Sequence, residues 1–155
     1  MNKACKLLVA MLVVSMLFSI VPQNVSASTS NNYVVVVNVL NVRAGAGTNF
    51  RILTTVSMGR HLTVSRYNGT WAYVGGGGWV HRNYIVRITA ASGTRTVNVG
   101  AGSTLNVRSA PTTASLAIGS LPNGARVTIT GRVSGWYRIS HGINSHAWVS
   151  AAWVR

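Results

Sequence analysis

The sequence contains no aspartate and no glutamate, although it is 155 residues long and carries fourteen lysines and arginines. Its side chains therefore cannot assemble a carboxylate pair or a catalytic triad oriented by an acid. Internal salt bridges to side-chain carboxylates are equally impossible. The repulsion among the basic groups must then be screened by salt or relieved by an anionic partner.

Cysteine is nearly absent as well, and the single Cys5 lies in an N-terminal segment that has the features of an export signal. Lys3 and Lys6 precede an apolar run over 7–21, and small residues follow at 25–27. We expect residues 1–27 to be a signal peptide that is cleaved before Ser28, because about fifteen apolar residues are short for a membrane span of roughly twenty. An uncleaved anchor is the alternative. The mature product would have no disulfide, no thiolate metal site and no thiol nucleophile, and we expect it to be secreted or in the cell wall by a Gram-positive-type route.

Arginine alone carries the charge of the predicted mature product. Both lysines fall in the signal, which leaves twelve arginines, six in each half of the remaining chain. Arginine stays protonated at any reasonable pH and grips phosphate or carboxylate through two parallel hydrogen bonds. This composition indicates an anionic partner, either a cell-wall polymer or a nucleic acid. Selection for an unusual habitat, or deliberate editing of the sequence, would leave the same composition.

Two segments of the chain repeat each other at a constant offset of 65 residues. The motif over 40–43, Leu-Asn-Val-Arg, returns at 105–108, and Gly59 corresponds to Gly124. Trp71 corresponds to Trp136, and after a four-residue insertion the Trp-Val pair at 79–80 corresponds to the pair at 148–149. Two units are too few for a solenoid. We therefore expect two independent domains, 30–87 and 95–155, joined by a linker over 88–94.

The pattern inside each unit is that of short strands. Leu62 and Val64 alternate with Thr63 and Ser65, and the residues at 127–130 alternate in the same way. Turn signals such as Asn-Gly at 68–69 and Ser-Gly at 134–135 separate these runs. Short, alternating strands with frequent turns predict an all-β fold, a small barrel or sandwich in each unit.

The same alternation sorts the aromatic side chains. Val74 and Ile139 mark the core face, so Ala72 and Tyr137 share it, whereas the residues at 71, 73, 136 and 138 face outward. We expect a ligand-binding groove in each unit, formed by Trp71, Tyr73, Arg82 and Tyr84 in the first and by Trp136, Arg138 and Trp153 in the second. The alternative is that Trp71 and Trp136 cover the open end of a barrel. We expect Trp79 and Trp148 in the core or at its rim.

The remaining candidates for chemistry are few. Four histidines, His61, His81, His141 and His146, are the only possible bases, and we expect no catalysis, no metal and no cofactor. The four glycines at 75–78 lack a lysine and a following helix, so they indicate a hairpin rather than a phosphate loop. Arg43 and Arg108 are expected to anchor the loop that follows each of them by donating to backbone carbonyls, with direct ligand contact as the alternative.

The repeated motif resembles the bacterial SH3-like (SH3b) domain family. The resemblance rests on Leu-Asn-Val-Arg, a loop rich in small residues, a glycine before an aliphatic-Thr-aliphatic strand, a tryptophan strand and a closing Trp-Val, over 40–86 and 105–154. It implies two small barrels of five to seven strands in tandem. It also implies an exported protein that binds peptidoglycan or other envelope components.

Together these observations favour a secreted, non-catalytic tandem of SH3-like barrels that recognises peptidoglycan and its associated anionic polymers. Two alternatives stay open at this point. Arginines interleaved with aromatics also suit a polyanion or extracellular nucleic-acid binder. An interaction subunit for a separate wall hydrolase is the other alternative.

Overall fold

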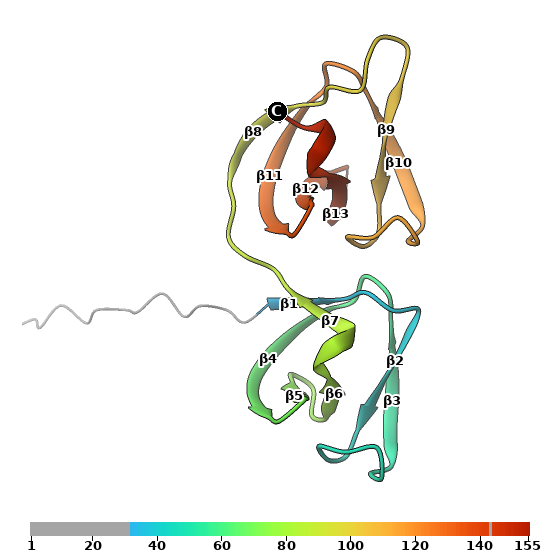
Figure 1. Ribbon diagram of the computed structural model, residues 1–155, viewed down its shortest axis with the longest axis vertical. Coiled ribbons are helices and arrows are strands. Elements are labelled where there is room, and N and C mark those ends of the chain that lie inside the picture. Colours follow the sequence, from blue (N-terminus) through green and yellow to red (C-terminus); the bar gives the residue numbers. More distant parts are fainter. Residues whose placement is uncertain (1–31, 143) are drawn as a thin grey trace, which may run out of the picture.

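The computed structural model describes residues 32–142 and 144–155, and the predicted signal peptide over 1–27 lies outside the described residues. The fold is all-β, as the alternation predicts, with thirteen strands and two 3-10 turns in the described ranges (Figure 1). Among these residues no helix is long and apolar enough to cross a membrane.

The first sheet has the strand order β3-β2-β6-β5-β4-β1-β7, with antiparallel pairing throughout. Its elements are β1 (Asn32–Val35), β2 (Val39–Arg43), β3 (Ile52–Ser57), β4 (His61–Asn68), β5 (Trp71–Val74), β6 (Trp79–His81), the turn η1 (Arg82–Tyr84) and β7 (Ile85–Arg87). The sheet curls into a barrel (Figure 1). The barrel encloses a core of aliphatic side chains. This core contains Val35, Leu40, Val42, Leu62, Val64, Ala72, Val74, Val80 and Ile85.

The second sheet repeats this plan with the order β10-β9-β13-β12-β11-β8. Its elements are β8 (Gly93–Thr96), β9 (Thr104–Arg108), β10 (Ala117–Pro122), β11 (Arg126–Val133), β12 (Trp136–His141), β13 (Asn144–Ser150) and the turn η2 (Ala151–Trp153). A single bridge between Val97 and Val154 stands where the first sheet has the β1–β7 pair. The core contains Val97, Leu105, Val107, Val127, Ile129, Ile139, Ala147, Val149 and Val154.

Strand alternation orients β5 and β12 as the sequence predicts. Val74 and Ile139 are 3% and 0% exposed and lie in the two cores, where Ala72 is also buried and Tyr137 packs against the second core. Trp71 and Trp136 therefore lie on the outer faces of their barrels, half-buried. Two separate cores of this kind give the chain two SH3-like barrels.

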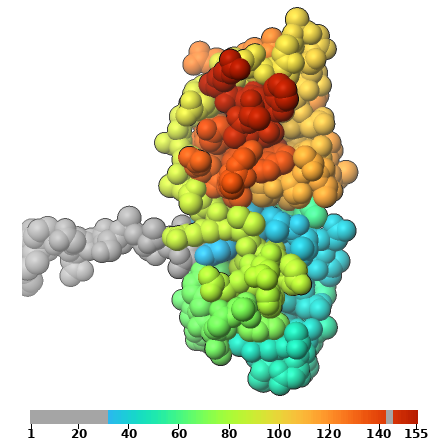
Figure 2. All heavy atoms as spheres, viewed as in Figure 1, coloured from blue at the N-terminus to red at the C-terminus, as the bar shows by residue number. Residues whose placement is uncertain are grey.

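The two barrels also pack against each other through a third apolar cluster. Figure 2 shows the two barrels in contact with each other. Val34 of the first barrel and Val133 and Trp148 of the second are buried together with Ile88, and Trp148 is fully buried. The backbone of Thr89 bridges that of Arg132, with two hydrogen bonds of 2.9 Å. The segment over 88–94, expected as a linker of small polar residues, therefore takes part in the junction, and its last two residues already belong to β8.

The leading strands of the two units show how the sequence builds this junction. Val35 and Val97 occupy the same position. Each donates its N–H to the carbonyl of the residue just before β4 or β11, Arg60 or Ala125, and accepts at its own carbonyl from the N–H of Gly59 or Gly124. Val34, one step earlier, is fully buried against the second barrel, whereas Thr96 at the same step in the second barrel is exposed. The first leading strand is apolar on both sides because both of its faces are covered.

Candidate ligand-binding grooves

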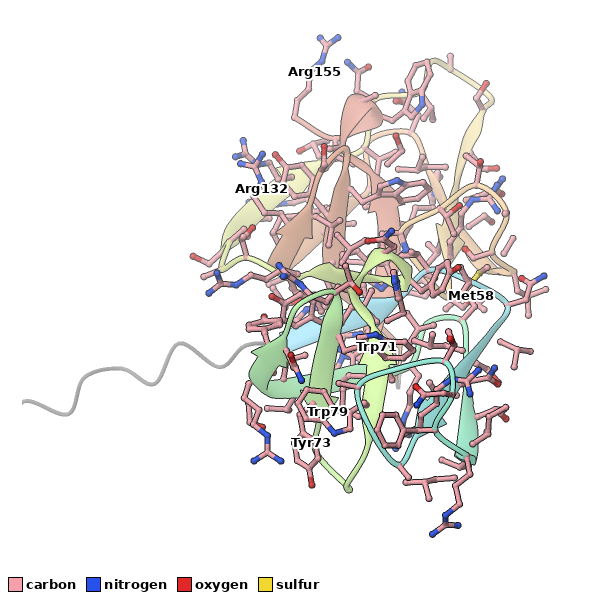
Figure 3. All side chains as sticks on the ribbon, turned by 60° about the horizontal axis from the view of Figure 1, so that its bottom comes forward. Met58, Trp71, Tyr73, Trp79, Arg132 and Arg155 are labelled. Atoms are coloured by element: carbon pink, nitrogen blue, oxygen red, sulfur yellow. The ribbon has the colours of Figure 1, made fainter. Side chains whose placement is uncertain are left out.

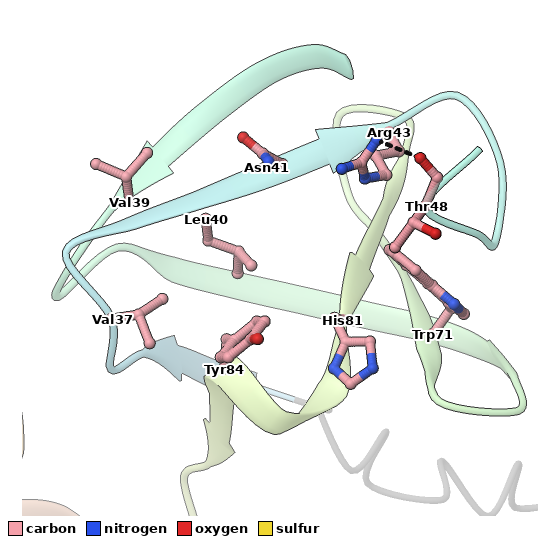
Figure 4. A pocket seen from close by; sticks show the side chains of 9 residues that line it. All are labelled: Val37, Val39, Leu40, Asn41, Arg43, Thr48, Trp71, His81 and Tyr84. Carbon is pink, nitrogen blue, oxygen red and sulfur yellow. Dashed lines mark hydrogen bonds between the residues drawn. The ribbon is translucent and has the colours of Figure 1, made fainter. Parts of the chain in front are cut away.

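Each barrel carries a groove on its outside, and equivalent positions of the two repeats line both grooves. Groove 1 has a volume of about 560 Å³ and is lined by Val37, Val39, Leu40, Asn41, Arg43, Thr48, Trp71, His81 and Tyr84 (Figure 4). Groove 2 has a volume of about 370 Å³ and is lined by Val99, Ser103, Thr104, Leu105, Asn106, Arg108, Thr113, Trp136, Ser150 and Trp153. The repeat is therefore a repeat of a concave surface as well as of a fold.

The walls of groove 1 come from β2, β5, β6 and η1. Trp71 on β5 pairs in register with His81 on β6, and their rings meet edge to face with centroids 5.3 Å apart. The His81 ring lies 5.4 Å from that of Tyr84, which η1 places at the next turn of the chain. Leu40 on β2 is 4% exposed and contributes an apolar lining side chain. Aromatic edges over an aliphatic floor suit a flat or extended ligand.

The loop after the first motif strand closes one end of each groove, and an arginine holds it. Arg43 Nη1 donates to the carbonyl oxygen of Thr48 at 3.0 Å (Figure 4) and to that of Phe50 at 2.8 Å. Arg108 Nη1 donates to those of Thr113 (2.8 Å) and Ser115 (2.7 Å). Each arginine thus joins two carbonyls of the loop that follows it, and the anchoring of that loop stays a prediction. Both guanidinium groups also line their grooves, so anchoring and ligand contact are geometrically compatible.

The two grooves differ in polarity and in the size of their aromatic walls. Ser150 replaces His81, and Trp153, which is 50% exposed, replaces Tyr84, which is 45% exposed. Groove 2 therefore has no histidine in its wall and presents the larger indole ring to solvent, and its volume is smaller than that of groove 1. Both grooves thus offer a ligand a tryptophan ring, an asparagine amide and an arginine guanidinium, but the rest of their walls differs.

Four of the seven predicted ligand-binding residues line a groove in the structure, and three do not. Trp71 and Tyr84 meet in groove 1, and Trp136 and Trp153 meet in groove 2. The other three, Tyr73, Arg82 and Arg138, line neither groove.

Arg82 and Arg138 make contacts within their own barrels instead. Arg82 Nη1 donates to the Gly69 carbonyl at 3.3 Å, and its guanidinium lies 4.6 Å over the Tyr67 ring. Arg138 donates from Nη2 to the carbonyl of Thr130 (2.6 Å) and from Nε to the hydroxyl of the same residue (3.1 Å). In a chain without side-chain carboxylates, arginines turn to backbone carbonyls and aromatic faces.

Sequence reasoning missed several groove residues that lie in the repeated motif itself. These are the leucine and asparagine of Leu-Asn-Val-Arg, the threonine of the following loop and the residue that pairs with the groove tryptophan, namely Leu40, Asn41, Thr48 and His81 with Leu105, Asn106, Thr113 and Ser150. The leucine, asparagine and threonine are identical in the two repeats, which was the available signal, and this identity was interpreted as a requirement of the fold. The pair His81 and Ser150 differs and gave no such signal. Trp148 is buried, as predicted for a core or rim residue, and Trp79 is half-buried.

Neither groove has the composition of a metal site. In residues 32–142 and 144–155, no three histidine, cysteine or acidic side chains come close enough to hold a metal ion. What the grooves offer is aromatic surface, an amide and a guanidinium. These groups can stack on a ligand or form hydrogen bonds with it. They give neither groove a general acid–base pair.

Comparison with known proteins places this architecture in a family. The chain is 29% identical over 129 residues to "Putative N-acetylmuramoyl-L-alanine amidase YrvJ" of Bacillus subtilis (strain 168), which covers 78% of this chain and 25% of that protein. The chain thus spans a quarter of the length of that relative. Two solved structures from Trichomonas vaginalis are more distant. NlpC2 is 16% identical over 84% of this chain and 49% of that one, and NlpC1 is 15% identical over 84% and 47%, each with a TM-score of 0.35, too low to carry an argument.

The family itself is matched twice. Residues 38–86 and 103–155 each match the family described as "Bacterial SH3 domain", and together they make up more than half of the chain. The two matches coincide with the two barrels and contain most of the residues of both grooves. The chain therefore belongs to the bacterial SH3 domain family, of which it carries two copies in tandem.

Proposed function

We propose that this protein binds the bacterial cell wall through grooves 1 and 2 and catalyses no reaction. The observation that supports this most is the equivalence of the two grooves. Leucine, asparagine, arginine, threonine and tryptophan occupy the same five places in both. A repeated barrel needs its core residues for folding, but the asparagine and the partly exposed tryptophan lie outside the two barrel cores. Trp136 also packs against the cluster between the barrels, yet the repetition of both residue types supports a shared ligand.

The ligand chemistry follows from the lining side chains. Trp71 or Trp136 offers a ring for stacking, and the adjacent amide of Asn41 or Asn106 offers both a donor and acceptor. Peptidoglycan combines amide-rich peptides with sugar rings and matches these groups. The same ligand is supported by the match to the bacterial SH3 domain family. It is also supported by the relative whose name gives N-acetylmuramoyl-L-alanine as its substrate.

The arginines add a second, less selective contribution. Twelve arginines and no side-chain carboxylate give the barrels a large positive net charge, which attracts the anionic polymers that accompany peptidoglycan. Binding of this polymer places the protein outside the cell or in the cell wall, in agreement with the predicted export signal.

Two grooves on one chain favour binding to a polymer. Because the barrels are packed together, the second groove is held near the ligand once the first is occupied. Linked sites of this kind raise overall affinity by roughly 10²- to 10⁴-fold when both reach the polymer together. Each groove can then be individually weak.

A sedimentation assay tests this function. The protein is mixed with purified peptidoglycan, with and without its anionic polymers, and the bound fraction is measured at physiological salt. We expect binding to both preparations, weaker after the polymers are stripped. Failure to bind either preparation, or tighter binding to DNA than to either, would overturn the proposal, and the second outcome would favour the polyanion binder.

A further inference from the structure

A row of four cross-strand neighbours crosses the outer face of each barrel at the same register. In the first barrel the row is Arg66 on β4, Tyr73 on β5, Trp79 on β6 and Arg43 on β2. In the second barrel it is Gly131 on β11, Arg138 on β12, Trp148 on β13 and Arg108 on β9. Matching registers make the two rows the same surface of the SH3-like barrel.

In the second barrel, the contact between the barrels covers this row. Trp148 is fully buried in the cluster that contains Val34 and Ile88. Gly131 is buried as well, and a Cβ atom added to it would lie 3.0 Å from the Ile88 side chain. A larger residue there would press on the Ile88 side chain and the Arg138 guanidinium, so the part of this row around Gly131 and Trp148 belongs to the contact between the barrels.

In the first barrel, the same row is open and has a different chemistry. Arg66 is exposed, and its guanidinium carbon lies 4.0 Å from the centroid of the Tyr73 ring and 5.5 Å from that of Trp79. The Tyr73 and Trp79 rings meet at 69° with centroids 5.3 Å apart, at the end of the first barrel away from the second (Figure 3). Cation and aromatic rings are thus held together on a partly exposed surface.

Another copy of this chain is a poor occupant for the open row. Arg66 stands where Gly131 allows close packing, so its side chain would block the equivalent approach of a second barrel. The complementary surface has changed too, because Thr96 and Arg126 take the places of Val34 and His61. Two positively charged chains would also repel each other, which leaves an anionic ligand as the favoured occupant.

We propose that Arg66, Tyr73 and Trp79 form a subsite, unique to the first barrel, for a sugar that carries a carboxylate or a phosphate. A guanidinium stacked on a ring keeps the N–H donors at its edge available for an oxyanion, while the stacking fixes its position. The two half-buried rings supply apolar surface for the sugar. No side-chain carboxylate exists in the chain to compete for Arg66.

The subsite adjoins groove 1 without being part of it. Tyr73 is two residues from Trp71 along β5, so their side chains share the outer face at about 7 Å spacing. One polymer chain can therefore run from groove 1 onto the subsite. The subsite does not require wall binding by the grooves, since its ligand contacts come from different side chains.

The test is an NMR titration of the ¹⁵N-labelled full chain, read at the indole N–H signals. The probes are N-acetylmuramic acid, which carries a carboxylate, glucose 6-phosphate, and neutral N-acetylglucosamine. We expect an acidic sugar to shift the Trp79 signal and to bind at least about tenfold more tightly than the neutral sugar. Binding of the carboxylate probe alone, of the phosphate probe alone or of both identifies the oxyanion source.

Matched variants separate a site from a general charge effect. Arg66→Gln should weaken acidic-sugar binding about tenfold and leave the neutral sugar unchanged, whereas Arg51→Gln, at another exposed arginine of the first barrel, should change neither. Equal weakening by both variants, or no shift at Trp79 with any probe, would overturn the subsite. If the protein fails to sediment with peptidoglycan but the acidic sugar still shifts the Trp79 signal, the proposed wall binding by the grooves is wrong and the subsite stands.

Discussion

The imidazole of His61 on β4 stacks on that of His146 on β13 across the contact between the barrels, with ring centroids 3.9 Å apart. His61 Nε2 is buried and has no hydrogen-bond partner among the described residues. Burial, followed in size by the positive charges of His146, Arg138 and Arg60, lowers the pKa of His61 from 6.5 to about 4. The folded protein therefore keeps His61 neutral where the unfolded chain would bind a proton.

This pKa predicts that the barrel contact weakens in acid. Above pH 6.5, His61 is neutral in both states and its contribution to stability is complete. As the pH falls from 6.5 to about 4, only the unfolded state takes up the proton, so the free energy of unfolding decreases. One group changes it by at most about 1.4 kcal/mol per pH unit, and by less here because His61 is only partly buried. Denaturant unfolding at several pH values measures the slope.

Replacing the titrating ring provides the control. His61→Phe keeps a flat ring against His146 and should flatten the pH dependence between 6.5 and 4. His81→Gln, in groove 1 and away from the contact, should leave it unchanged. The same slope in all three proteins would show that His61 does not report on the contact.

A pair of equivalent glycines tests the contact between the barrels by itself. Gly59 and Gly124 have φ values of +82° and +83°, but a Cβ atom on Gly59 would lie 2.5 Å from the carbonyl oxygen of Ser109 in the other barrel, whereas one on Gly124 would meet nothing within 4 Å. Both alanine variants incur the cost of a left-handed residue, about 1–2 kcal/mol. Gly59→Ala must in addition push the barrels apart. We expect a clearly larger loss in free energy of unfolding for Gly59→Ala, and equal losses would contradict a close contact.

The anchoring arginines give a prediction about the loops. A lysine at 43 or 108 keeps the charge but cannot donate to both loop carbonyls in the geometry of a guanidinium. Arg108→Lys should destabilise the protein by about 1–3 kcal/mol and speed amide hydrogen exchange in the loop over 109–116. Arg126→Lys, on the outside of the same barrel, should do neither. Unchanged exchange in the loop of the Arg108 variant would show that the loop holds its own shape.

The sequence predicted the barrels because alternation and turn residues act locally. Val74, Ile139 and the glycines after Asn68 and Ser134 determine strand faces and turns without reference to distant residues. The aromatic groove residues Trp71 and Trp136 followed from the same alternation. Their partners in the grooves did not, because a floor residue such as Leu40 looks identical to any other core residue in sequence.

The contact between the barrels was harder to predict. It depends on two segments that are far apart in sequence. Polar and apolar residues alternate over 96–99, whereas the run over 33–37 is apolar throughout. This difference is present in the sequence, and it indicates that both faces of the first leading strand are covered. Arg138 was assigned to ligand binding because it follows the alternation outward, but the outer face of β12 is where the first barrel packs, and its guanidinium bonds to Thr130.

The charge of the chain predicts a salt-dependent contribution to wall binding. If several arginines contact anionic polymer, the logarithm of the affinity should fall linearly with the logarithm of the salt concentration, by about 0.7–0.9 per phosphate for nucleic acids. The slope should be shallow on stripped peptidoglycan, where the grooves dominate. Sedimentation at a series of salt concentrations measures both slopes. Salt-independent binding to the complete wall would contradict an electrostatic contribution.

The most direct measurement is the affinity of groove variants for purified peptidoglycan. Tyr84 and Trp153 are the half-exposed aromatics of the two grooves, so their truncation should cost little stability. Each single variant, Tyr84→Ala or Trp153→Ala, should bind about ten- to a hundredfold more weakly, since a stacking aromatic contributes about 1–3 kcal/mol. The double variant should lose more than either, and Tyr67→Ala, outside both grooves, should bind normally. Wild-type affinity in the double variant, with its melting temperature unchanged, would show that the grooves do not bind the wall.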